Sequence, residues 1–84
     1  MNEMIILVSG LVSEGISFKF EMQNWEGLDG MEVTFIHNRE KYIVYWNPIS
    51  CGYNSGLLEV RVHGNGDLIK IYEYAKAVDI LGTL

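Results

Sequence analysis

Hydrophobic and polar residues alternate most regularly through residues 31–47, which read MEVTFIHNREKYIVYWN. A fold-back at Asn38-Arg39 matches three apolar pairs on one face of a hairpin: Phe35 with Tyr42, Val33 with Val44, and Met31 with Trp46. A shift of one residue would mix the two faces, so the alternation selects a single register. Asn-Arg is not the Asn-Gly that a two-residue turn prefers, and a four-residue loop, His37 to Glu40, would close the hairpin in the same register.

Two further segments have the period of a half-buried strand. Residues 16–23, ISFKFEMQ, alternate between apolar and polar side chains, and residues 57–63, LLEVRVH, do the same. Residues 24–30 contain two glycines and an aspartate and are expected to connect the first strand to the hairpin. Residues 47–56 contain Pro48 and several turn-forming residues and are expected to be irregular.

The N-terminal segment, residues 2–13, satisfies two patterns. Its apolar residues recur at helical spacing, and Glu3 suits the positive end of a helix dipole. Against a helix stand several β-branched residues and Gly10 in the middle of the segment. We expect a short helix whose apolar positions include Met4, Ile5, Val8, Leu11 and Val12, and the alternative is an additional strand.

The segment that follows Gly64 also allows two structures. Asn65-Gly66 is a strong hairpin signal and would pair Val62 with Ile69 and Val60 with Ile71. Yet apolar residues recur at helical spacing from Leu68 to Val78, with Asp67 as a candidate N-cap. The hairpin would also place Arg61 beside Lys70, a like-charge pair. We therefore expect a helix over residues 67–81.

Together these elements predict a single α+β domain spanning residues 1–84. Its centre is a small four-stranded antiparallel sheet, with an N-terminal helix (or extra strand) and a C-terminal helix packed on one face. No internal repeat or linker divides the chain. The covered face is expected to consist of Phe18, Phe20, Val33, Phe35, Val44, Trp46, Val60 and Val62.

The distribution of charged residues limits the classes of partner that we expect the chain to bind. The 84 residues carry a net charge of −5. Residues 1–36 hold six acidic residues against Lys19 alone, whereas residues 37–84 hold five acidic and five basic residues, so the whole excess lies in the N-terminal part. Direct binding to nucleic acid needs a basic footprint, which this chain lacks. A basic protein partner, including one that itself binds nucleic acid, fits this charge.

No motif indicates catalysis, a cofactor or a metal site. Cys51 is the only cysteine, and it forms no metal-type spacing with His37 or His63. The alternative of a small enzyme or toxin would need one of these histidines beside a carboxylate. The first residues lack the basic stretch of an export signal, and no apolar run is long enough to span a bilayer. We expect a cytoplasmic protein, located in the host cytoplasm if a phage encodes it, with no membrane association.

The second face of the central hairpin supplies the candidate binding residues. If the helices cover the Phe35 face, then Ile36, Ile43 and Tyr45 face outward together with Glu32. An exposed aromatic and β-branched cluster with a charged border is typical of a protein-binding surface. We expect an acidic edge and a loop aromatic to contribute as well: Glu21, Glu26, Asp29 and Trp25. The alternatives are that the N-terminal segment crosses this face or that a homodimer buries it.

These observations predict a small acidic protein-binding module that acts as an inhibitor by blocking the surface of a partner. Small size, the acidic N-terminal part and the absence of catalytic motifs are shared by phage-encoded anti-defence proteins such as anti-CRISPR proteins, by antitoxins and by immunity proteins. That comparison concerns size and composition alone. The alternatives are the small enzyme and a homo-oligomeric structural subunit.

Overall fold

The computed structural model describes residues 3–25, 28–46 and 57–84, and for residues 23–25 and 28–29 it describes the backbone alone. The fold is α+β, as the sequence predicts, but the sheet has five strands rather than four. In chain order the elements are α1 (Glu3–Ser13), β1 (Phe18–Trp25), β2 (Leu28–His37), β3 (Glu40–Trp46), β4 (Leu58–Gly64), β5 (Asp67–Tyr74) and α2 (Ala77–Leu81).

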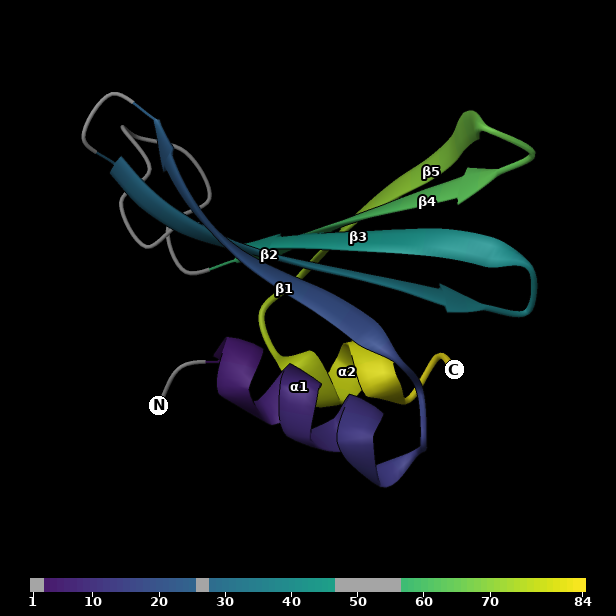
Figure 1. Ribbon diagram of the computed structural model, residues 1–84, viewed down its shortest axis with the longest axis horizontal. Coiled ribbons are helices and arrows are strands. Elements are labelled where there is room, and N and C mark those ends of the chain that lie inside the picture. Colours follow the sequence, from purple (N-terminus) through teal and green to yellow (C-terminus); the bar gives the residue numbers. More distant parts are fainter. Residues whose placement is uncertain (1–2, 26–27, 47–56) are drawn as a thin grey trace.

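The sheet is an antiparallel meander in the order β1-β2-β3-β4-β5, so β1 and β5 are its two edges. Both helices lie side by side on the same face of the sheet (Figure 1). We call this covered side the inner face and the opposite side the outer face. The connecting segment 47–56, which the sequence predicts to be irregular, lies outside the described residues.

The β2–β3 hairpin has the predicted register, with Phe35 opposite Tyr42, Val33 opposite Val44 and Met31 opposite Trp46. The Phe35 and Tyr42 rings stack with their centroids 5.0 Å apart. The hairpin closes with a two-residue turn at Asn38-Arg39 and not with the four-residue loop, because His37 and Glu40 are themselves paired. Asn38 and Arg39 have φ values of 51° and 67°, the left-handed conformation that matches the twist of paired strands.

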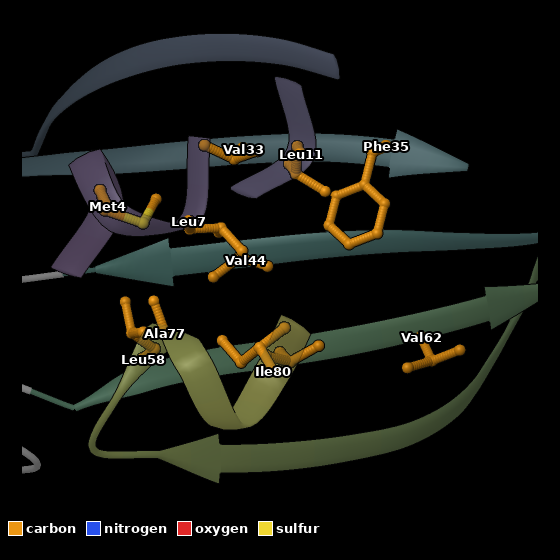
Figure 2. Close-up of a cluster of buried hydrophobic side chains, with 11 residues drawn as sticks. Met4, Leu7, Leu11, Val33, Phe35, Val44, Leu58, Val62, Ala77 and Ile80 are labelled. Carbon is orange, nitrogen blue, oxygen red and sulfur yellow. The ribbon is translucent and has the colours of Figure 1, made fainter. Parts of the chain in front are cut away.

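The hydrophobic core lies between the inner face and the two helices. From the sheet it takes Val33, Phe35, Val44, Leu58, Val60 and Val62, and from the helices Met4, Leu7, Leu11, Ala77 and Ile80. Figure 2 shows the helical side chains projecting onto strands β2 to β4. Phe20, which we expected in the core, is 43% exposed because the helices do not extend over β1.

The N-terminal segment is a helix, and the alternative strand is excluded. Its buried stripe consists of Met4, Leu7 and Leu11, whereas Ile5 and Val12, two of the expected inward positions, are exposed. The helix is therefore rotated about its axis relative to the expectation. Gly10 has a packing role, because a Cβ at this position would overlap the side chain of Leu81 on α2. The glycine lets the two helices approach each other closely.

The expected helix over residues 67–81 is wrong, because its first half is strand β5 and only Ala77–Leu81 is helical. Asn65 and Gly66 form a tight turn with φ values of 54° and 85°. An irregularity in pairing between Val62 and His63 then shifts the register, so that Lys70 lies opposite Val62 and Arg61 opposite Ile71. The like-charge Arg61–Lys70 pair that argued against a hairpin does not form.

A long-range hydrogen bond holds the start of α2. This helix has five residues, and the side chain of its N-cap residue, Lys76, makes no capping hydrogen bond. Instead the Glu3 Oε1 atom accepts a hydrogen bond of 2.7 Å from the backbone N–H of Ala77. A carboxylate at a helix N-terminus satisfies a free amide and interacts well with the helix dipole. The first turn of α1 thereby caps the last helix of the chain.

The two hairpin turns provide a matched stability test. Arg39→Gly should raise the free energy of unfolding by about 0.5–1 kcal/mol, because glycine adopts a positive φ without the strain of a Cβ. Gly66→Ala should lower it by about 1 kcal/mol, since no atom lies within 4 Å of the new Cβ and only the backbone conformation is penalised. Urea denaturation measures both, and destabilisation by Arg39→Gly would contradict the two-residue turn.

Removing the cap of α2 should also be measurable. Glu3→Ala should lower the free energy of unfolding by about 1–2 kcal/mol, because the Ala77 amide loses a charged acceptor. Glu3→Gln keeps an acceptor oxygen and should lose less. The matched control is Glu14→Ala just beyond the other end of α1, which removes a carboxylate from the negative end of that dipole and should not destabilise. Equal losses for Glu3→Ala and Glu3→Gln would show that the side chain does not act as an acceptor.

Candidate protein-binding surface

The outer face contains a row of acidic residues that crosses the whole sheet. Register places Glu21 opposite Glu32, Glu32 opposite Tyr45, Tyr45 opposite Glu59, and Glu59 opposite Glu73. Each strand thus contributes one residue. Tyr45 lies at the centre, with Glu21 and Glu32 on one side of it and Glu59 and Glu73 on the other. We call these five residues, Glu21, Glu32, Tyr45, Glu59 and Glu73, the acidic row.

A second row lies directly beside the acidic row and mixes cations with apolar residues. It consists of Lys19, Thr34, Ile43, Arg61 and Ile71, which also face one another across successive strands. Ion pairs connect the rows at two places: Lys19 Nζ lies 2.7 Å from Glu21 Oε1, and in another strand of the described sheet Arg61 Nε lies 3.1 Å from Glu59 Oε2. Both pairs are solvent-exposed, so water screens them and they add little to stability.

The next row of the outer face, beyond the one that contains Ile43 and Arg61, includes Ile36. This side chain is 68% exposed and lies on β2 opposite Lys41 of β3. Lys41 in turn faces His63 of β4. In the described part of the chain no helix lies over this face. Ile36, Ile43 and Ile71 lie on it among charged side chains, with Arg61 between Ile43 and Ile71.

Tyr45 lies among charged side chains at the middle of the acidic row. Burial raises the pKa of its hydroxyl above the ordinary value of 10.0, and a hydrogen bond with Glu32 and the charges of Glu32 and Glu59 raise it further. The Arg61 guanidinium acts in the opposite direction, and its Cζ atom lies 5.2 Å from the centroid of the Tyr45 ring. Tyr45 therefore stays neutral at physiological pH and presents an aromatic ring within an acidic row.

The acidic row includes two like-charge pairs, Glu21 with Glu32 and Glu59 with Glu73. Like charges directly opposite each other on neighbouring strands lower the stability of a sheet. The adjacent cations Lys19 and Arg61 offset part of this repulsion. Further positive charge placed against the row would offset more of this repulsion.

The structure brings together five of the eight residues that the sequence singles out: Ile36, Ile43, Tyr45, Glu32 and Glu21 all lie on the outer face. Trp25 ends β1 and Asp29 lies in β2, but their side chains are not described, and Glu26 lies outside the described residues. The alternative in which the N-terminal segment crosses this face is wrong, because α1 packs on the inner face.

Sequence reasoning missed the half of the surface that β4 and β5 supply. Glu59 and Arg61 alternate outward in the sequence pattern, but only the β3–β4 register places them beside Tyr45. Ile71 and Glu73 were missed because their segment was predicted to be helical. The Asn65-Gly66 turn signal could have identified them.

The inner face also has a concavity, beyond the end of α2. This pocket of about 240 Å³ lies over β3–β5 and has Val60, Val62 and Ile80 among its apolar lining residues. Its polar and aromatic lining is Glu40, Tyr42, Lys70, Tyr72, Tyr74 and Thr83. Burial raises the pKa of the Tyr42 hydroxyl above 10.0, with a smaller contribution from the charge of Glu40.

Within residues 3–25, 28–46 and 57–84, no group of three or more His, Cys, Asp and Glu side chains is placed to hold a metal ion. His63 belongs to the outer face, whereas the alternation of β2 assigns His37 to the inner face, so the two imidazoles do not share a site. Cys51 lies outside the described residues.

The chain matches no protein-family model, no curated protein and no solved structure. In the part of the chain that the structure describes, no helix is both long enough and apolar enough to cross a membrane. The interpretation of the surface therefore depends on its geometry and chemistry.

The tyrosine environments predict how stability changes at alkaline pH. Tyr42 and Tyr45 have raised pKa values in the folded state, whereas an unfolded tyrosine titrates near 10. Above that pH the folded protein retains more protons than the unfolded chain, so the stability that these groups provide is lost as pH rises. The free energy of unfolding should decrease as the pH rises through and above the ordinary tyrosine pKa of about 10, and that of the Tyr42→Phe/Tyr45→Phe double variant should decrease less. Identical decreases would contradict these environments.

Proposed function

We propose that this protein is a small acidic protein-binding module that occupies a functional surface of its partner with the outer face of its sheet. The observation that carries the proposal is the placement of both helices on the inner face. Among the described residues this placement leaves the outer face uncovered across five strands, with exposed isoleucines beside the acidic row that has Tyr45 at its centre.

The chemistry of this surface fits a protein partner. Its exposed isoleucines offer apolar area, and Tyr45 and Arg61 belong to the residue types that most often dominate the energy of protein interfaces. The surrounding Lys and Glu side chains supply the polar rim that such interfaces have. The acidic row selects a partner with basic residues, because electrostatic complementarity favours encounter and fixes the docking register.

A basic surface on another protein is commonly one that binds nucleic acid or another polyanion. A module that covers it would act as an inhibitor by competition and would need no catalytic group. We therefore propose a non-catalytic inhibitor that works in the cytoplasm, of the kind found among phage anti-defence proteins (anti-CRISPR proteins included), antitoxins and immunity proteins. The acidic row and the chain's net charge of −5 support this assignment.

The test is affinity capture from the native cell lysate with variants that differ in one side chain. Ile43→Asp places a charge in the middle of the outer face, next to Arg61 and Thr34. Val78→Asp is the matched control, because Val78 is exposed on the first turn of α2, where an acidic residue suits the dipole. Wild type and Val78→Asp should retain the same partner, and Ile43→Asp should lose it.

Salt dependence and a folding control complete this test. The retained protein should elute at raised salt, because screening weakens contacts between the acidic row and a basic surface. Circular dichroism should show that all three chains are folded. Retention of the same protein by Ile43→Asp, or no retained protein in any lane at low salt, would contradict the proposed function.

A further inference from the structure

Edge strand β1 leaves apolar side chains uncovered on the inner face. Phe20 is 43% exposed and Met22 is 61% exposed, although both point to the side of the sheet that carries the helices. Every edge strand also has backbone amide and carbonyl groups on its free side that can pair with another strand. The β1 edge thus combines free backbone groups with unburied apolar side chains.

The sequence of β1 is complementary to itself under antiparallel pairing. With a two-fold axis at Phe20, Phe20 faces Phe20 of a second copy, and Phe18 faces Met22 on the same side. On the opposite side Lys19 faces Glu21 of the second copy, and this pair occurs twice. Opposed residues share a face in such a pairing, so apolar groups meet on the inner side and opposite charges on the outer side.

An apolar groove between α1 and β1 offers space for the second copy. Its volume is about 280 Å³, and its lining includes Met4, Ile5, Val8, Phe18, Phe20 and Met31. Ile5 is itself exposed on α1. Phe18, Phe20 and Met22 of a second β1 strand would extend the inner face alongside this groove and remove its apolar lining from water.

The opposite edge, β5, is less suited to self-pairing. A two-fold axis at Lys70 would bring two ammonium groups together, and an axis at Ile71 would place Ile69 against Glu73. The register shift near its start also disrupts the regular ladder that a new strand would extend. Charged side chains and irregularities are the usual devices that protect an edge strand from pairing.

We propose that the protein forms a two-fold symmetric homodimer in which the β1 strands of two copies pair antiparallel about Phe20. The two sheets then form one continuous sheet, and the two outer faces lie on the same side of it. The dimer presents two copies of the acidic row to a partner, which raises avidity for a partner with repeated basic surfaces. The dimer does not rest on the proposed function, because its evidence is the β1 edge. Lys19 and Glu21, which pair across that edge, also lie on the outer face, so the dimer is tested by its molar mass and not by the capture of a partner.

The test is the molar mass in solution, measured by light scattering during gel filtration over a range of concentrations. The chain has a mass of 9.6 kDa, so the dimer should have twice that value. Lys19→Glu places two carboxylates opposite each other at both charged positions, and Glu21→Lys places two ammonium groups there. Each variant should weaken dimerisation about tenfold or more, because two favourable cross-strand pairs become repulsive.

Mixing the two variants separates intermolecular pairing from any effect within one chain. A Lys19→Glu chain facing a Glu21→Lys chain has opposite charges at both positions, so the mixture should form a heterodimer that neither variant forms alone. The Lys19→Glu/Glu21→Lys double variant should also recover the dimer. A Lys70→Glu control on β5 should leave the mass unchanged.

Three results would overturn the proposal. The first is a wild-type mass of 9.6 kDa at every concentration up to about 1 mM, a very weak association on the affinity scale. The second is a dimer that both single charge variants leave intact. The third is a dimer lost in Lys70→Glu, which would place the interface at β5 instead.

Discussion

Burial of the inner face beneath two short helices is the constraint on which the rest of the structure depends. Helix α1 has 11 residues and α2 has five, and their buried side chains cover the central strands β2 to β4. Each buried leucine or isoleucine in this layer contributes about 1.5–3 kcal/mol through removal from water. The two helices are too short to cover five strands. Apolar side chains at the β1 edge therefore stay exposed, and because both helices lie on the inner face, no helix of the described residues covers the outer face.

The helix pair depends on contacts between the two ends of the chain. A five-residue helix is not stable on its own, so α2 needs partners outside its own sequence. Glu3 accepts a hydrogen bond from the first amide of α2, and Gly10 leaves room for Leu81. The same residues explain two features of the N-terminal segment, an acidic residue at its start and a glycine in its middle. Both features serve helix-to-helix packing, which periodicity alone does not reveal.

Local alternation predicted the centre of the fold well and its end poorly. The β2–β3 register followed from the sequence because only one pairing keeps Phe35, Val33 and Tyr42 on a common face. Segment 67–74 was predicted to be helical because its apolar residues fit the period of a helix as well as that of a strand. The irregularity near Val62 also shifts the hairpin register away from the one that the sequence suggests. The core of the candidate surface, Ile36, Ile43 and Tyr45, was predictable from strand alternation. The acidic row was not, because its members come from five strands whose alignment only the folded sheet establishes.

The proposed binding surface exists only if the helices cover one face of the sheet and leave the other open. Methyl NMR with a soluble paramagnetic agent tests it directly, because the agent broadens signals from exposed methyl groups and spares buried ones. The methyl groups of Ile36 and Ile71 should broaden strongly, whereas those of Val33, Val44 and Ile80 should be protected. Protection of Ile36 and Ile71 together with broadening of Val33 and Val44 would show that the helices pack on the other face, and the proposed binding surface would be lost.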